Sequence, residues 1–311
     1  MIRKEELTFD SRDGESKIVA TKWIPEGEPK CILQIVHGMA EYIDRYDEFA
    51  RILAEKGILV VGDDHLGHGR TAKINHAKQG YFCKQDAATV LVRDEHRLKK
   101  TVEKEFPHVP YIIMGHSMGS FITRNYLYTY GTGIRAAIIC GTGNQPKVLV
   151  NAGLLLCRIV GLFRGQKHVF GLLNAAAFGT YNKKIENPKT NVDWVSRNEE
   201  NLQKYLQDPD CGFTFTVNGF TTLLTLVKRL TDIHKVEQMP KTLPILFISG
   251  KEDPVGNYGK GVEQVYEQYK NIGMEDVSLK LYENDRHEIL NEADRQTVYE
   301  DVYNWIEAHL S

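Results

Sequence analysis

Apolar runs of strand length alternate with amphipathic helical patterns along most of the chain, and this alternation restricts the fold more than any other feature. The expected strands lie at residues 6–11, 17–24, 31–38, 58–64, 111–115, 136–141, 244–250 and 277–283. Unbroken apolar runs are typical of strands that are covered on both faces. Strands separated by helices form parallel sheets with right-handed crossovers. The pattern therefore predicts an α/β fold with a mostly parallel eight-stranded sheet and helices on both faces.

The first three expected strands are separated only by the turn clusters "RDGE" (12–15) and "PEGEP" (25–29), which predicts a β-meander. A typical expected helix follows later. Its apolar residues repeat at helical spacing from Leu91 to Phe106, and Pro107 ends the pattern. Its opposite face carries four charged residues that we expect to be solvated: Lys99, Lys100, Glu103 and Lys104.

Between about Asn144 and Met239 the alternation stops, because helical patterns continue there without a convincing strand. We therefore expect an α/β core from residues 1–143 and 240–311, and a helical insertion, residues 144–239, between strands 6 and 7. The segment "GLLLCRIVGLFRG" (153–165) in the insertion is nearly all apolar. We favour a cover over an apolar pocket, with docking on a membrane as the alternative.

Composition excludes several kinds of partner. A net charge of −2 with 26% charged residues indicates neither nucleic acid nor an anionic membrane surface. The chain starts without an apolar segment of signal-peptide length, and no stretch approaches the roughly 20 apolar residues of a membrane span. We expect a cytoplasmic protein with no nucleic-acid partner and no stable membrane insertion; the oligomeric state stays open.

Neither the cysteines nor the histidines indicate a metal site. The five cysteines are odd in number and scattered, without a CxxC pair. His65, His68 and His76 lie among glycines and polar residues without a recognisable metal spacing. We expect no metal and no organic cofactor, and Asp64 in "DDHLGHGR" to be a helix-capping residue.

The stretch "PYIIMGHSMGSFIT" (110–123) contains Gly-x-Ser-x-Gly, which is typical of a sharp strand-to-helix turn that presents a serine nucleophile, Ser117. A serine hydroxyl needs a base, and the base needs an acid to orient it. Glu252 and Asp253 follow the seventh expected strand, and His287 follows the eighth. We favour Asp253, because Pro254 promotes an extended backbone at the residue before it. An ordinary turn at Ser117 and a solvated charged cluster around His287 are the alternatives.

Five segments resemble the α/β-hydrolase superfamily, in particular its branch of monoacylglycerol lipases and bacterial lysophospholipase-like hydrolases (serine aminopeptidase S33-type). They lie within residues 9–309 and are "VHGMAEYIDRYDEFARILAEKGILVVGDDHLGHGR" (36–70), "GHSMGS" (115–120), "VDWVSRNEENLQKYLQDPDCGF" (192–213), "GKEDPV" (250–255) and "RHEILNE" (286–292). The family commonly has a second glycine at Ser120, and Gly-Glu-His in place of Ala40, Glu41 and Tyr42. These differences leave the expected site residues untouched.

The resemblance implies an α/β-hydrolase fold with the insertion as a cap over an acyl pocket. It implies Ser117 as the nucleophile, Asp253 as the acid and His287 as the base. The backbone N–H groups of Met39 and Met118 would form the oxyanion hole. The implied activity is hydrolysis of lipid-like carboxylic esters through an acyl-enzyme on Ser117, of the monoacylglycerol lipase or lysophospholipase type.

Other functions of the same fold stay open. One is an aryl or short-chain carboxylesterase, and another is an aminopeptidase, which needs acidic groups in the cap to bind the substrate's ammonium ion. The candidates for this role lie on stretches that we expect to be solvated: Glu199, Glu200, Asp208 and Asp210. A non-catalytic binding protein is the third alternative, although its usual mark is a missing triad residue.

Overall fold

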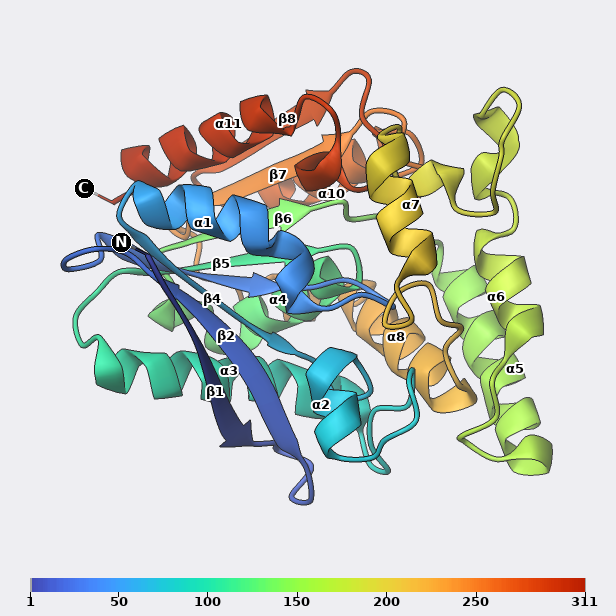
Figure 1. Ribbon diagram of the computed structural model, residues 1–311. Helices are drawn as coiled ribbons and strands as arrows, with labels where there is room; N and C mark the ends of the chain where they lie inside the picture. The colour runs from blue at the N-terminus through green and yellow to red at the C-terminus, as the bar shows by residue number, and fades with distance from the viewer. Residues whose placement is uncertain (1, 311) are drawn as a thin grey trace.

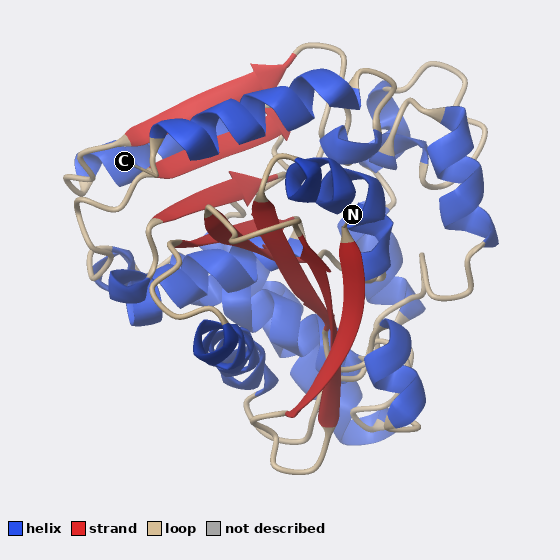
Figure 2. Ribbon diagram, turned by 60° about the vertical axis from the view of Figure 1, so that its left-hand side comes forward, coloured by secondary structure: helices blue, strands red, loops and turns tan. Residues whose placement is uncertain are grey.

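The computed structural model describes residues 2–310 and contains an eight-stranded sheet in the order β1-β2-β4-β3-β5-β6-β7-β8. Helices lie on both sides of the sheet (Figure 2). The strands are β1 (Arg3–Asp10), β2 (Lys17–Ile24), β3 (Cys31–Val36), β4 (Ile58–Asp64), β5 (Tyr111–His116), β6 (Ala136–Cys140), β7 (Ile245–Gly250) and β8 (Val277–Tyr282). All neighbours from β4 to β8 pair in parallel, and only β1 and β2 are antiparallel to theirs. The predicted α/β fold is confirmed.

The predicted β-meander is wrong, because β4 lies between β2 and β3. Strand β2 pairs antiparallel with β4, and β3 pairs in parallel with β4 and β5. Helix α1 (Asp47–Glu55) connects β3 to β4, so β4 returns in parallel beside β3 and occupies the position that a meander gives to β2. Turn residues report on a local change of direction, whereas the order of strands depends on pairing between distant segments.

Helices cover both faces of the sheet. Helices α1 and α11 (Arg295–Ala308) contribute to one apolar core, on one face. The other face carries α3 (Ala87–Glu105), α4 (Met118–Tyr130) and α10 (Lys260–Asn271), whose apolar residues belong to a second core. The short helix α2 (Gly69–Ile74) follows β4, and 3₁₀ turns lie at Ile43–Tyr46, Gly131–Gly133, Tyr181–Lys184, Asp193–Val195 and Ile289–Asn291.

Lys99, one of the four charged residues of α3 that were predicted to be solvated, is buried. The side chain of Lys99 is only 2% exposed. Its ammonium group lies 4.9 Å from the centre of the Tyr111 ring and pairs with the carboxylate of Glu103. A long aliphatic stem with a cation at its end can be covered when both parts find partners, and here the ring and the carboxylate provide them.

The insertion contains α5 (Lys147–Arg164), α6 (Gly171–Phe178), α7 (Glu199–Gln207), α8 (Val217–Leu230) and α9 (Ile233–Val236). It adds no strand to the sheet, and its helices lie at the end where the parallel strands have their carboxyl ends (Figure 1). Helix α8 also packs on α3 and α4, where the side-chain amide of Asn125 donates to the carbonyl of Leu226 at 3.1 Å. Within residues 2–310, no helix combines the length and apolarity needed to cross a bilayer.

Candidate active site

Ser117 occupies a strained turn between β5 and α4. Its backbone has φ 54° and ψ −120°, which residues with a side chain rarely adopt. The turn is packed tightly, because a Cβ atom on Gly119 would lie 1.9 Å from the carbonyl oxygen of Val36. The N–H of Ser117 donates to the carbonyl of Cys140 at 3.0 Å. The predicted strand-turn-helix geometry is confirmed, and the half-buried Ser117 is held next to the end of β6.

Asp253 and His287 meet at the ends of β7 and β8. Nδ1 of His287 lies 2.9 Å from Oδ2 of Asp253, and the two side chains are 5% and 0% exposed. Oδ1 of Asp253 accepts the N–H of Val255 at 2.8 Å, which holds the carboxylate in place. The carboxylate of Glu252 instead pairs with the guanidinium of Arg197 in the insertion. Because the Nδ1–H of His287 donates its hydrogen bond to Asp253, the lone pair of the imidazole is left on Nε2, as a general base requires.

Ser117 lies against the last residue of β6, Cys140, and His287 lies against the next residue, Gly141. A Cβ atom on Gly141 would be 3.2 Å from Cε1 of His287, and Cys140 binds the N–H of Ser117. The Ser117 hydroxyl forms no hydrogen bond within residues 2–310. Hydrogen bonds between a nucleophile and its base are often long in unliganded enzymes and tighten when substrate binds. The three predicted residues lie beyond the carboxyl ends of β5, β7 and β8, with β6 between the strand of Ser117 and that of Asp253.

Two backbone N–H groups flank Ser117. Met118 is the first residue of α4, and first-turn N–H groups have no partner in their helix. Met39 follows Gly38, whose added Cβ atom would lie 3.1 Å from Cβ of Ser117. Within the described chain, neither the Met39 nor the Met118 N–H donates a hydrogen bond. Two free donors beside a serine are the arrangement that an oxyanion hole requires.

Sequence reasoning missed a buried polar network centred on Glu41. Its Oε1 accepts the N–H of Gly38 at 2.6 Å and the hydroxyl of Tyr46 at 2.9 Å. It also lies 3.2 Å from Nδ1 of His116, whose Nε2 is 3.2 Å from the carbonyl of His287. The network thus connects the loop of Met39 to the loop of His287. Its only signal in the sequence is the acidic residue in "HGMAEY".

Arg45 extends this network into the insertion. Its guanidinium lies 3.1 Å from Glu41 and binds both oxygens of Glu288, at 2.5 and 2.7 Å. It also donates to Asn201 at 3.2 Å and lies 5.0 Å from the centre of the Tyr205 ring. Burial alone would raise the pKa of the Glu41 and Glu288 carboxyl groups. The pKa of Glu41 is nevertheless lowered, by His116 and Arg45, and the pKa of Glu288 is lowered by Arg45. The segment around His287 is therefore part of a buried ionic network. The alternative interpretation of the sequence, a solvated charged cluster around His287, is wrong.

Asp64 binds an N–H group at the start of α2, as predicted for a capping residue, although His68 and not Asp64 stands at the N-cap position of that helix. Oδ2 of Asp64 accepts the N–H of Arg70, in the first turn of α2, at 2.9 Å. Its Oδ1 accepts the N–H of Ile43 at 2.9 Å. The neighbouring His68 lies 3.3 Å from the N–H of Ala40, in the loop of Met39. This segment supports the candidate site and contains no part of the predicted triad.

The insertion contacts the candidate site directly. The ring of Trp194 lies 5.2 Å from the ring of His287, and the rings of Phe178 and Tyr181 pack around Trp194 at 6.2 and 5.0 Å. The N–H of Gly212 donates to the carbonyl of Ala40 at 2.9 Å. An aromatic surface of the insertion therefore borders His287, and a backbone hydrogen bond joins the insertion to the loop of Met39.

The four acidic residues that an aminopeptidase could use all have partners. Glu199 pairs with Lys189, and Glu200 pairs with Lys204 at 2.7 Å. Asp208 accepts the hydroxyl of Tyr42 at 2.7 Å. Asp210 pairs with Lys73 and accepts the amide of Gln79 at 3.1 Å. Glu199 and Glu200 form exposed ion pairs at the surface, and Asp208 and Asp210 are held by partners from other segments.

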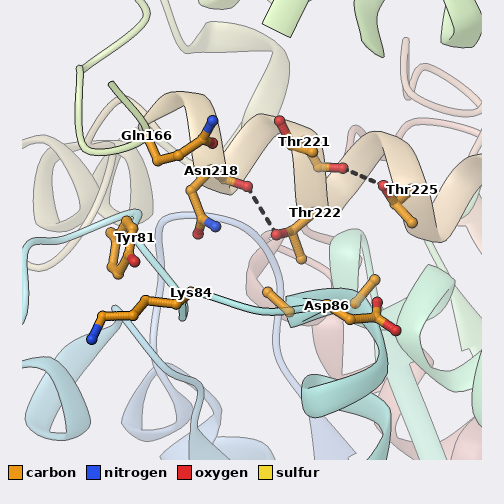
Figure 3. A pocket seen from close by; sticks show the side chains of 10 residues that line it. Tyr81, Lys84, Asp86, Gln166, Asn218, Thr221, Thr222 and Thr225 are labelled. Atoms are coloured by element: carbon orange, nitrogen blue, oxygen red, sulfur yellow. Dashed lines mark hydrogen bonds between the residues drawn. The ribbon is translucent and has the colours of Figure 1, made fainter. Parts of the chain in front are cut away.

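A separate polar cavity of about 260 Å³ lies between α8 and the segment that precedes α3 (Figure 3). The hydroxyls of Thr222 and Thr225 bond to carbonyls of their own helix, at 2.8 and 2.6 Å. The side chain of Asn218 spans the two sides by binding the backbone of Phe82 and Cys83 at 2.9 and 2.8 Å. The residues that line this cavity include no member of the predicted triad.

The sheet order and the strained Ser117 turn define the class of protein, an α/β-hydrolase. The family model of serine aminopeptidase, S33, matches residues 27–294, and the chain belongs to this family. The resemblance found in the sequence is thereby confirmed.

Relatives of this chain include esterases and lipases. The monoacylglycerol lipase of Mycolicibacterium smegmatis is 29% identical over 306 residues, covering 96% of this chain and 95% of the relative. A thermostable carboxyl esterase from Bacillus coagulans, solved in complex with glycerol, is 31% identical with a TM-score of 0.93 and full coverage of both chains. A lipase solved in an open form is 27% identical with a TM-score of 0.89, covering 99% of this chain and all of its own.

Proposed function

We propose that the protein is a serine hydrolase that cleaves carboxylic esters of lipid-like substrates, of the monoacylglycerol lipase or lysophospholipase type. The observation that carries this proposal is the 2.9 Å hydrogen bond between Asp253 and His287, formed next to the strained turn of Ser117. The family match and the relationship to a monoacylglycerol lipase and a carboxyl esterase support the same reaction.

In the proposed mechanism, Nε2 of His287 removes the proton of Ser117 Oγ while the oxygen attacks the ester carbonyl. The N–H groups of Met39 and Met118 stabilise the negative oxygen of the tetrahedral intermediate. His287 then gives its proton to the departing alcohol, which leaves an acyl group on Ser117. Water activated by His287 attacks this acyl-enzyme and releases the acid. Asp253 holds the imidazole in the required tautomer throughout.

Residues 144–239 form the proposed cap. Its aromatic surface of Phe178, Tyr181 and Trp194 borders His287, and an acyl chain bound to Ser117 would lie against these rings. Apolar side chains with few polar groups are typical of ligand sites that select by shape and length. The proposed specificity for lipid-like esters rests on this surface.

The outer side of the proposed cap suits transient contact with lipid aggregates. Helices α5 and α6 expose large apolar residues, among them Val148 (77%), Leu162 (76%), Phe163 (82%) and Leu172 (70%). Residues 144–178 contain no Asp or Glu, whereas Lys147, Arg158, Arg164 and Lys167 are basic. Although the net charge of the whole chain does not indicate an anionic membrane surface, exposed apolar side chains beside basic ones within one segment are typical of helices that bind the interface of anionic lipids. The contact would bring the proposed cap to the substrate without inserting a helix across the bilayer.

The alternatives differ in substrate or in chemistry. An aminopeptidase is disfavoured because the four acidic residues of the insertion that were considered for binding an ammonium ion each have a partner within the chain. A short-chain or aryl carboxylesterase would use the same triad, so only a comparison of acyl chain lengths separates it from a lipase. A binding protein of this fold would not react with a fluorophosphonate probe.

The deciding experiment compares the parent protein with Ser117→Ala. We expect turnover of medium-chain monoacylglycerols to fall by about 10⁴- to 10⁶-fold, and labelling by the probe to disappear, while the unfolding temperature changes little. Hydrolysis of a p-nitrophenyl ester by Ser117→Ala at near the parent rate would overturn the mechanism. A parent preference for two-carbon over ten-carbon esters would retain the mechanism and reject the lipid substrate.

A further inference from the structure

A second cluster of buried polar side chains lies behind the loop of Met39. Asp63 is the last residue but one of β4, His65 directly follows the strand, and Glu95 comes from the middle of α3. Nδ1 of His65 lies 3.4 Å from Oδ1 of Asp63 and 3.3 Å from Oε1 of Glu95, and the three side chains are at most 1% exposed. The three atoms all lie within 4.8 Å of one another.

These three atoms lack the partners that buried polar atoms normally have. Oδ1 of Asp63, Nδ1 of His65 and Oε1 of Glu95 form no hydrogen bond within residues 2–310. The other nitrogen of His65, Nε2, lies 3.2 Å from the carbonyl oxygen of His37 and therefore carries a proton. If His65 carried no second proton, the lone pair of Nδ1 would point at two carboxylate oxygens. Such an arrangement is unfavourable in a buried place unless a positive charge lies between the three atoms.

We propose that Asp63, His65 and Glu95 bind a divalent metal ion, for which Zn²⁺ fits best. Zinc binds imidazole nitrogen and carboxylate oxygen at about 2.0–2.2 Å, so two ligand atoms of a tetrahedral site are roughly 3.4 Å apart. The two separations from Nδ1 of His65, 3.3 and 3.4 Å, match that spacing. They exceed the roughly 2.7–2.9 Å of charged N–H···O hydrogen bonds. Two carboxylates also neutralise a divalent ion, which leaves no net charge in the buried site.

The groups around the cluster orient it as the surroundings of a metal site do. Histidines that bind metals usually donate their other N–H to a carbonyl or a carboxylate, and His65 has the carbonyl of His37 in that position. The second oxygen of Glu95 accepts the side-chain amide of Gln34 at 2.5 Å. Gln34 is fixed in turn by the hydroxyl of Tyr111 at 2.6 Å. A buried glutamine in the middle of β3 is explained by this supporting role.

The proposed ion has a structural role that is separate from ester hydrolysis. It ties β4 and α3 to His37, which precedes Gly38 and Met39 in the loop that provides one proposed oxyanion donor. The histidine spacing in "DDHLGHGR" gave no indication of such a site, because the third ligand comes from α3. The competing explanation is a proton in place of the ion, shared between His65 and the two carboxyl groups.

The test measures zinc in protein expressed with added Zn²⁺ and purified without a metal-affinity tag. We expect about one ion per chain after dialysis in the parent, and less than about 0.1 in Glu95→Gln and His65→Gln. The matched control is Asp94→Asn, which removes the adjacent buried carboxylate of α3. Asp94 binds the hydroxyl of Ser11 and the N–H of Arg12, at 2.7 and 2.5 Å, so the control should retain its zinc.

A measurement on the parent protein alone covers the case in which the variants fail to fold. Expression with Co²⁺ should give the visible absorption bands of a tetrahedral N/O site, and a strong chelator should lower the unfolding temperature by roughly 5–10 °C. A parent protein with less than about 0.1 zinc per chain and no cobalt bands overturns the proposal in favour of the shared proton. Zinc retained by folded Glu95→Gln and His65→Gln overturns the assignment of the ligands.

Discussion

The loops around Ser117 and the outer helices of the insertion differ in whether their side chains have partners within the chain. Around Ser117, charged groups such as Glu41, Arg45 and Glu288 are buried and each has several partners. On α5 and α6, large apolar side chains such as Leu162 and Phe163 are 76% and 82% exposed. The first region holds the residues of the candidate site in place through many contacts. The second region presents a surface suited to a partner outside the chain. We infer that reaction and substrate access depend on different parts of the molecule.

The largest expected effect tests whether the buried region carries the chemistry. Asp253→Asn should lower kcat by about 10⁴-fold with little change in KM, because an amide does not hold His287 in the required tautomer. Hydrolysis of p-nitrophenyl butyrate measures the change. The control Glu252→Gln alters the neighbouring carboxylate, which faces Arg197, and should keep near-parent activity. Equal losses in both variants would contradict the assignment of Asp253.

A second substitution tests whether the ionic network holds the site together. Arg45→Met removes the cation between Glu41 and Glu288, so two buried carboxylates lose their counter-charge. We expect a loss of about 3–5 kcal/mol in the free energy of unfolding, measured with urea. The control Arg51→Met removes an exposed ion pair with Asp47 and should change stability by less than about 0.5 kcal/mol. Similar values for the two variants would show that the network contributes little.

The same network predicts how stability depends on pH. The pKa of Glu41 is lower in the folded protein than in the unfolded chain, so its contribution is present above the unfolded pKa of about 4.3. It is lost as the pH falls below that value, because the unfolded state binds the proton first. Unfolding free energies measured between pH 7 and pH 3 should therefore fall less in Glu41→Gln than in the parent, by about 1.4 kcal/mol for each pH unit below about 4.3. Equal slopes would place the acid sensitivity elsewhere.

The smallest expected effect tests the outer surface. Replacing Leu162 and Phe163 by serine should lower the rate on monoolein in anionic vesicles about 3- to 10-fold, because less apolar area enters the lipid. Hydrolysis of dissolved p-nitrophenyl butyrate should stay unchanged. Leu206→Ser is the matched control, because this leucine is also exposed (47%) but lies on α7. A parallel loss on both substrates would show that the change reaches the buried region.

Local patterns in the sequence were sufficient for much of the fold. Each of the eight strands lies within a few residues of its predicted position, because unbroken apolar runs and glycine or proline boundaries are properties of neighbouring residues. The turn of Ser117 and the contact between Asp253 and His287 were predictable in the same way. Each of these residues follows a strand, and parallel strands bring their carboxyl ends to one edge. Their catalytic roles remain predictions.

The sequence by itself thus determined the fold class, and it predicted the insertion and the residues of the candidate site. Only the tertiary structure decided the place of β4 between β2 and β3, the burial of Lys99, and the network of Glu41, Arg45 and Glu288. It also decided that Glu95 faces Asp63 and His65. The physical reason is that a charged residue has the same local pattern whether it is solvated or buried. Its state depends on partners that packing brings from distant parts of the chain.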